Sequence, residues 1–254
     1  MTRRFDHDGV EIAFLDEGQG RPILLIHGFA SNHQVNWVGT GWVDMLVRAG
    51  RRVIALDNRG HGLSTKLYDP ADYHTRRMAD DALALFDHLG IETAAVMGYS
   101  MGARISAHLA LAAPARLSAM ILGGLGIHLV DGVGLPTTIA AAMEAQSLAD
   151  VADPMGRTFR AFADQTGADK AALAACIRGS RQTLTRDEVG GIRVPTLIAV
   201  GTRDRIAGSA ADLAALMPNA VALDIPDKDH NPAVGDRHFK QGALAFLSAH
   251  EAPV

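Results

Sequence analysis

The sequence contains a single cysteine, Cys176, among 254 residues. One thiol cannot form a disulfide within the chain, so a reducing compartment, the cytoplasm, is the simplest location. No apolar stretch is long enough to span a bilayer, and the first residues lack the apolar run of a signal peptide. The sequence therefore predicts a cytoplasmic protein without a membrane partner.

Clusters of one charge are also missing. The net charge is −4, and no basic block or basic amphipathic helix stands out, so a nucleic acid is not an expected partner. Metal-binding spacings of the His-Glu-x-x-His or Cys/His type do not occur. Nor does a Gly-rich loop ending in Lys-Ser/Thr that would cradle phosphate. We therefore expect no metal site and no cofactor.

Hydrophobic residues, by contrast, make up 48% of the chain, which is ample for a sizeable core. Apolar or alternating runs typical of strands cover 3–8, 10–16, 22–26, 52–56, 94–99, 117–122, 194–200 and 221–225. Helix-like segments cover 35–49, 75–89, 103–113, 210–217 and 234–250. Alternation of strands and helices predicts parallel pairing with right-handed crossovers, preceded by a hairpin that turns at Asp8-Gly9.

This alternation stops between residues 127 and 192, where no strand-like run occurs. Asp153-Pro154 is typical of a helix start, with a capping aspartate and proline at the first position. Thr185 with Glu188 has the spacing of a capping box. We therefore expect a core formed by 1–126 and 193–254, with 127–192 inserted as a helical cap.

The stretch 94–103 carries the main functional signal, because Gly98 and Gly102 bracket Ser100 in the pattern Gly-x-Ser-x-Gly. A buried strand precedes the serine and a helix of small residues follows it. A sharp turn between them projects the hydroxyl away from the backbone, and glycine avoids the crowding that a Cβ would cause there. The alternative without a catalytic role is an ordinary serine at a helix N-cap, where serine is common.

A serine hydroxyl is a poor nucleophile at neutral pH and needs a base, for which histidine is suited because its unperturbed pKa lies near the working pH. A carboxylate then holds the imidazole in the right tautomer. Asp204 and His230 both follow the ends of apolar strand runs, at the same sheet edge as Ser100. The order Ser100, Asp204, His230 is the one found in α/β-hydrolases.

With these motifs in place, the sequence resembles the α/β-hydrolase superfamily over nearly its whole length, in particular small esterase-like and haloperoxidase-like members. The motifs that carry the resemblance are His27-Gly28-Phe29, Asp57-x-Arg59-Gly60-His61-Gly62-x-Ser64, Gly98-Tyr99-Ser100-Met101-Gly102, Gly201-Thr202-Arg203-Asp204 and Asp229-His230. The resemblance implies an α/β fold: a mostly parallel eight-stranded sheet with helices on both faces and a helical cap insertion.

The resemblance also implies an oxyanion hole made by two backbone N–H groups, those of Met101 and Phe29. It places His27 in the oxyanion loop rather than in the role of base, and it treats His61 as structural. The histidines of the last helix, His238 and His250, are interpreted as surface residues.

Other carboxylates are weaker candidates for the acid. The strand at 117–122 is followed by glycines and has no carboxylate before Asp131. Asp227 and Asp229 are too close to His230 along the chain to face its ring easily, so we interpret them as loop charges.

The expected cap offers Met143, Met155, Phe159, Phe162 and Leu173 as side chains that either line a pocket or pack the cap onto the core. Arg178 and Arg181 either meet an anionic group or pair locally, and Tyr99 is interpreted as packing.

The sequence thus predicts a serine hydrolase that cleaves a small carboxylic ester through an acyl-enzyme, with a small-molecule ester as its partner. The alternatives are thioester, lactone or carbon–carbon bond hydrolysis or perhydrolysis on the same triad. A further alternative is a ligand-binding receptor on the same fold. The oligomeric state does not follow from the sequence.

Overall fold

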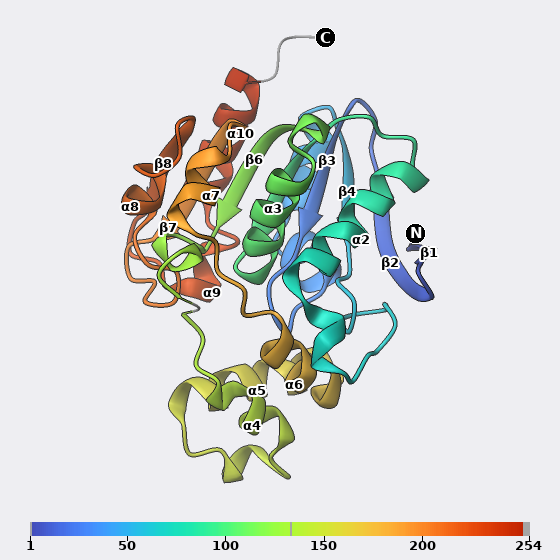
Figure 1. Ribbon diagram of the computed structural model, residues 1–254, viewed down its shortest axis with the longest axis vertical. Helices are drawn as coiled ribbons and strands as arrows, with labels where there is room; N and C mark the ends of the chain where they lie inside the picture. Colours follow the sequence, from blue (N-terminus) through green and yellow to red (C-terminus); the bar gives the residue numbers. More distant parts are fainter. Residues whose placement is uncertain (1, 133, 251–254) are drawn as a thin grey trace.

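The computed structural model describes residues 2–132 and 134–250, and its centre is one eight-stranded sheet (Figure 1). The strands are β1 (Arg3–His7), β2 (Val10–Glu17), β3 (Arg21–Ile26), β4 (Arg51–Leu56), β5 (Ala94–Tyr99), β6 (Leu117–Gly123), β7 (Thr196–Gly201) and β8 (Ala220–Ile225). Their order across the sheet is β1-β2-β4-β3-β5-β6-β7-β8. The pairs β1·β2 and β2·β4 are antiparallel and the remaining pairs are parallel, so the predicted fold class is confirmed.

The expected hairpin joins β1 to β2 through Asp8 and Gly9, whose φ angles are 53° and 77°. His7 pairs directly with Val10, so the loop has two residues. Positive φ at both loop positions is the conformation whose twist matches that of the flanking strands.

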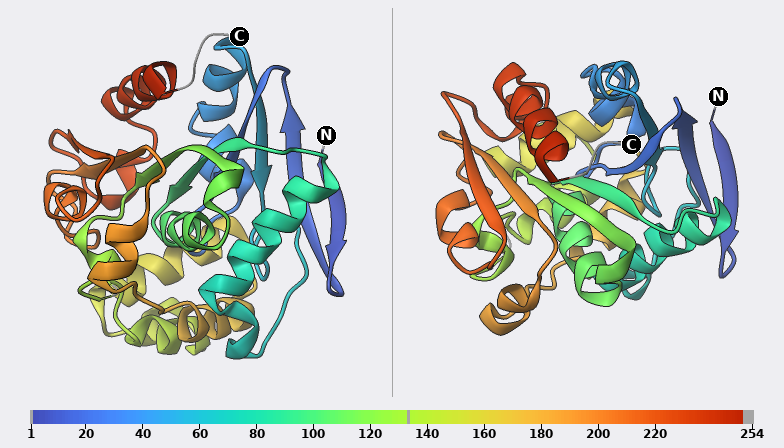
Figure 2. Two further views of the ribbon diagram at one scale, coloured as in Figure 1. Left: turned by 45° about the horizontal axis from the view of Figure 1, so that its top comes forward. Right: turned by 90° about the horizontal axis from the view of Figure 1, so that it is seen from above.

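Helices cover both faces of the sheet (Figure 2). One face carries α1 (Trp42–Arg48) and α10 (Arg237–His250); the other carries α2 (Thr75–His88), α3 (Met101–Ala112) and α8 (Ala210–Ala214). Every residue of the central strand β5 is buried, as expected for a strand covered on both sides. Each face therefore has its own apolar cluster, one with Trp42 and Phe239 and the other with Phe86 and Ile105.

Two helices that the sequence predicts as continuous are divided. The segment 35–49 forms a π-helical turn (Gln34–Val38) and then α1, because Gly41 takes a left-handed φ of 76° between them. The segment 234–250 contains only α10, preceded by the short α9 (His230–Ala233). Asp236 accepts a hydrogen bond from the N–H of His238 at 2.7 Å, which stabilises the new helix start.

The insertion between β6 and β7 is helical, as predicted. It contains α4 (Thr138–Glu144), α5 (Pro154–Thr166), α6 (Lys170–Gly179) and α7 (Arg186–Gly191). Both predicted helix starts are confirmed: Asp153 accepts the N–H of Gly156 at 2.6 Å, and Thr185 and Glu188 form a reciprocal capping box. Short 3-10 turns cover Pro70–Tyr73, Pro114–Arg116, Ile127–Leu129 and Leu148–Asp150.

In Figure 1, α4, α5 and α6 lie beyond the carboxyl ends of the parallel strands, whereas α7 runs back beside β7. The buried guanidinium of Arg104, on α3, links the start of the insertion to the segment between α6 and α7. It donates to the carbonyl oxygens of His128 at 2.9 Å and Gln182 at 2.8 Å. We propose 126/127 and 192/193 as the boundaries between core and cap, which limited proteolysis would test.

Within residues 2–132 and 134–250, no helix is both long enough and apolar enough to cross a membrane.

Candidate active site

Ser100 lies at the turn from β5 into α3 and has a strained backbone, with φ 55° and ψ −111°. A Cβ at Gly98 would overlap the carbonyl group of Gly102, and a Cβ at Gly102 would overlap the carbonyl oxygen of Ile26. Both glycines are therefore required by close backbone contacts. The tight turn carries the Ser100 hydroxyl to the carboxyl edge of the sheet.

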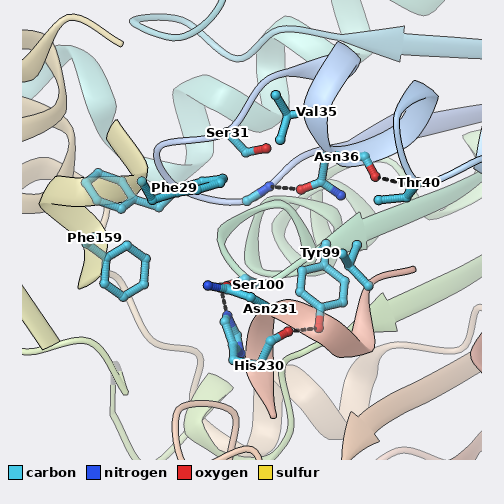
Figure 3. A pocket seen from close by; sticks show the side chains of 13 residues that line it. Phe29, Ser31, Val35, Asn36, Thr40, Tyr99, Ser100, Phe159, His230 and Asn231 are labelled. Atoms are coloured by element: carbon cyan, nitrogen blue, oxygen red, sulfur yellow. Dashed lines mark hydrogen bonds between the residues drawn. The ribbon is translucent and has the colours of Figure 1, made fainter. Parts of the chain in front are cut away.

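The side chains of Ser100, His230 and Asp204 form a hydrogen-bonded series (Figure 3 shows its first step). The Nε2 atom of His230 lies 3.0 Å from the Oγ atom of Ser100. The Nδ1 atom of the same ring lies 2.7 Å from the Oδ2 atom of Asp204. Asp204 follows β7 and His230 begins α9 just after β8, so three separate strand ends supply the three groups.

The surroundings of Asp204 fix the direction of these hydrogen bonds. Its carboxylate is fully buried, and its second oxygen accepts the N–H groups of Ile206 at 2.8 Å and Ala207 at 3.1 Å. Because a carboxylate only accepts, the proton of the neutral imidazole lies on Nδ1. Nε2 is then left as the acceptor for the hydroxyl proton of Ser100.

Two further contacts hold the main chain of His230. Asp229 accepts its N–H at 2.8 Å, and the hydroxyl of Tyr99 donates to its carbonyl oxygen at 2.5 Å. Tyr99 is buried, and burial raises the pKa of its phenol well above the usual value. The sequence suggested only packing for Tyr99; no pattern in it signals a hydrogen bond to a residue 131 positions away.

The competing histidines are engaged elsewhere. Nε2 of His27 accepts the N–H of Asn58 at 3.0 Å, and Nδ1 of His61 lies 2.9 Å from the carbonyl oxygen of Arg59. Burial lowers the pKa of His27 to about 4 and that of His61 to about 3. On α10, His250 contacts the carbonyl oxygen of Phe246 within its own helix.

The competing carboxylates also have other partners. Asp227 forms an exposed ion pair with Arg203 at 2.7 Å, and Asp131 forms one with Arg186 at 3.3 Å. Asp229 caps α9. Of these carboxylates, Asp204 is the one in contact with the ring of His230.

The loop after β3 lies beside the nucleophile, and a side chain that the sequence did not single out holds it. The Oδ1 atom of Asn36 accepts the N–H of Gly28 at 3.2 Å (Figure 3). The next residue is Phe29, whose ring contacts that of Phe159 on α5. Met101 is the first residue of α3, where a helix leaves its N–H groups without intrahelical partners. These positions suit donors to a developing oxyanion.

Two cavities meet at Ser100. The larger, about 190 Å³, is lined by Gly28, Phe29, Ser31, Val35, Asn36, Thr40, Tyr99, Ser100, Phe159, Phe162, His230, Asn231 and Val234. The smaller, about 30 Å³, is lined by Phe29, Ser100, Met101, Arg104, Gly124, Leu125, Gly134, Leu135, Ile177, Ser180 and Ile206.

The structure separates the cap side chains that the sequence could not assign. All five contribute to one apolar cluster or pack against it. Phe159 and Phe162 also line the larger cavity and Met155 lines a broad groove beside α5, whereas Met143 and Leu173 line neither cavity. Arg178 pairs with Glu144 at 2.6 Å, and Arg181 donates to the carbonyl oxygen of Leu135. In the part of the chain that the structure describes, no group of three His, Cys, Asp or Glu side chains could hold a metal ion.

The family described as "alpha/beta hydrolase fold" matches residues 21–132. A non-heme haloperoxidase from Rhodococcus erythropolis is 30% identical over 253 residues, which cover 88% of this chain and 90% of that protein. The chain belongs to the α/β-hydrolase family. Its eight-stranded sheet with a helical insertion after β6 is the fold of that family.

Other relatives of this α/β-hydrolase carry different names. The dihydrolipoyllysine-residue acetyltransferase component of an acetoin cleaving system from Pseudomonas putida is 34% identical over 248 residues, covering 91% of this chain. The match spans 64% of that longer protein. A solved thermophilic esterase from Thermogutta terrifontis superposes with a TM-score of 0.78 at 25% identity, covering 99% of this chain and all of the other.

Proposed function

We propose that this α/β-hydrolase is a serine hydrolase that cleaves small carboxylic esters through an acyl-enzyme. The observation that carries the proposal is the series Ser100–His230–Asp204, with distances of 3.0 Å and 2.7 Å. The likeness to a solved esterase agrees with it. The larger cavity of about 190 Å³ favours a small substrate.

In the first half-reaction, the Oγ atom of Ser100 attacks the ester carbonyl carbon while its proton passes to Nε2 of His230. The tetrahedral intermediate then breaks its bond to the alkoxy oxygen, which takes the proton from His230 and leaves as the alcohol. Asp204 stabilises the imidazolium throughout. In the second half-reaction, His230 takes a proton from water, which attacks the acyl-enzyme, and Ser100 recovers its proton as the acid departs.

The N–H groups of Phe29 and Met101 are our candidates for the oxyanion hole. Removing one such donor typically costs about 2.7–4 kcal/mol of activation free energy. Since both donors are backbone groups, their side chains are not the decisive test. The side chain that holds the loop, Asn36, is a better target.

Perhydrolysis is the second candidate, since a haloperoxidase is among the relatives at 30% identity. In this reaction hydrogen peroxide, rather than water, attacks the same acyl-enzyme, and the product is a peracid. The residues required are the same. Only the competition between the two nucleophiles separates the candidates.

Kinetics with p-nitrophenyl acetate test the proposal. We expect steady turnover, which Ser100→Ala lowers by about a thousandfold or more. A peroxide-containing assay for the peracid measures the share of perhydrolysis. A single stoichiometric burst without turnover, or ligand-induced stabilisation alone, would instead indicate a receptor on this fold.

A further inference from the structure

The two cavities at Ser100 share two lining residues, are otherwise lined by different ones, and differ about sixfold in volume, 190 Å³ against 30 Å³. Both are lined by Ser100 and Phe29. The reacting carbonyl must lie where they meet, because its carbon bonds to Ser100 and its oxygen turns toward the proposed donors. The two remaining substituents of that carbon, the acyl chain and the alkoxy group, then extend into separate cavities.

The position of His230 shows which cavity receives the alkoxy group and which receives the acyl chain. Its ring must protonate the alkoxy oxygen as the alcohol leaves, so the alkoxy group has to lie beside Nε2. His230 and Asn231 line the larger cavity. Apart from the shared Phe29 and Ser100, the residues that line the smaller one come from α3, from α6 and its C-cap, and from the loops around Leu125, Leu135 and Ile206. The leaving group therefore belongs in the larger cavity and the acyl chain in the smaller (Figure 3 shows the larger).

The volume of each cavity then limits the size of the substrate group that it can hold. A cavity of about 10–15 Å³ holds one water-sized group, so the smaller cavity of about 30 Å³ admits about two such groups beyond the carbonyl carbon. The apolar walls of the smaller cavity are buried side chains, including Leu125, Leu135 and Ile177. Close-packed walls of this kind do not yield easily to a longer chain.

The side of the leaving group is more open. A broad groove of about 1020 Å³, between α5 and the loops after β7 and β8, shares Phe159, His230 and Asn231 with the larger cavity. After the first half-reaction the alcohol must depart, and a water molecule must take its place beside His230. The groove provides a route for both, and it gives a bulky leaving group room to extend.

On the basis of the proposed function, we propose that the enzyme selects esters with a short acyl group and a larger alcohol. The smaller cavity receives an acyl group of about two or three carbons, acetyl or propionyl. The larger cavity and the groove receive the alcohol portion. Specificity is thus strict on the acyl side and permissive on the alcohol side.

Two isomeric esters test this assignment with the unmodified enzyme. Pentyl acetate and methyl hexanoate have the same composition and similar chemical reactivity, but they place the long chain on opposite sides of the carbonyl. We expect kcat/KM to be roughly tenfold or more higher for pentyl acetate. If both esters are hydrolysed with equal kcat/KM, or if kcat/KM is higher for methyl hexanoate, the assignment of the cavities is overturned while the proposed hydrolysis stands. Turnover of neither ester overturns the proposed function and the assignment with it.

Two truncations in the same helix sharpen the result. Ile177 lines the smaller cavity, and Ile177→Ala should shift the ratio of kcat/KM toward methyl hexanoate by roughly tenfold or more. Leu173, also buried on α6, lines neither cavity, so Leu173→Ala should leave the ratio unchanged even if it lowers the melting temperature. The same shift in both variants would contradict the assignment, because general loosening of the cap would then explain it.

Discussion

The hydroxyl of Tyr99, the residue before the nucleophile, donates a 2.5 Å hydrogen bond to the carbonyl oxygen of His230. The rings of these two residues also lie 5.6 Å apart between centroids. The proposed base is therefore tied to the end of β5, directly before Ser100, in addition to its own contact with the serine hydroxyl.

Tyr99→Phe removes this hydrogen bond and leaves the ring in place. We expect the free energy of unfolding to fall by about 0.5–1.5 kcal/mol, as for a typical buried hydrogen bond. If the poorer orientation of His230 raises the activation free energy by about 1.4 kcal/mol, kcat falls roughly tenfold while KM changes little. Steady-state kinetics and urea unfolding measure the two effects. A lower stability with unchanged kcat would limit Tyr99 to a structural role.

Asn36 holds the proposed oxyanion loop by accepting the N–H of Gly28. In Asn36→Ala this N–H loses its acceptor and the neighbouring N–H of Phe29 moves. We expect kcat to fall by roughly tenfold to a hundredfold, less than for complete removal of a donor. The matched control is Asn32→Ala, which removes an acceptor for the N–H of Val35, at the start of the π-helical turn that follows the loop. Equal losses in the two variants would argue against a role for Asn36 in particular.

Gly102 has no room for a methyl group, because a Cβ there would overlap the carbonyl oxygen of Ile26. Gly102→Ala should lower the free energy of unfolding by about 3 kcal/mol or more, since backbone must shift to accommodate it. At Gly191, the last residue of α7, a Cβ would instead point into open space, with nothing outside its own helix turn within 4 Å. Gly191→Ala should be neutral or slightly stabilising. The melting temperatures of the two variants measure this contrast. Similar values would refute the argument that the backbone around Gly102 leaves no room for a Cβ.

His108 lies on α3 with its Nε2 atom buried and without a partner in the described part of the chain. Burial, aided by the nearby Arg104, lowers its pKa from 6.5 to about 4. As the pH falls from 6.5 toward 4, the unfolded chain binds a proton that the folded protein does not, so the wild type loses stability across this window. His108→Leu removes that loss.

The melting temperature of His108→Leu, relative to that of the wild type, should therefore be higher at pH 5 than at pH 8. Between the two pH values, the free energy of unfolding of His108→Leu relative to the wild type should change by roughly 1–2 kcal/mol. Other buried histidines, such as His27 and His61, are unchanged and cancel in the comparison. A melting-temperature difference that is the same at both pH values would show that His108 does not titrate as its burial requires.

The sequence predicted the sheet, the hairpin and the helical insertion because each has a local signal. Continuous apolar runs marked β5 and β7, and Asp153 and Thr185 marked helix starts. It also named Ser100, Asp204 and His230 from their order and their places after strand ends. The structure places these three within hydrogen-bonding distance in series. Their catalytic roles remain a proposal.

What the sequence could not supply depends on contacts between distant segments. Nothing local shows that Tyr99 reaches the main chain of His230 or that Asn36 holds Gly28. Nor does it show that Arg104 joins His128, at the start of the insertion, to Gln182. The division of the segment 35–49 did have a local signal, the glycines at 39 and 41, which the prediction of one helix did not use. Volumes on the two sides of Ser100 likewise depend on several elements at once.

Covalent trapping tests the central claim, that Ser100 is a nucleophile activated by His230. A fluorophosphonate ester loses fluoride to an activated serine, and intact-mass and peptide mass spectrometry locate the adduct. We predict one adduct per chain on the peptide that contains Ser100, none in Ser100→Ala, and labelling slowed by about a thousandfold in His230→Ala. An adduct on another serine, or equally fast labelling without His230, would contradict the account.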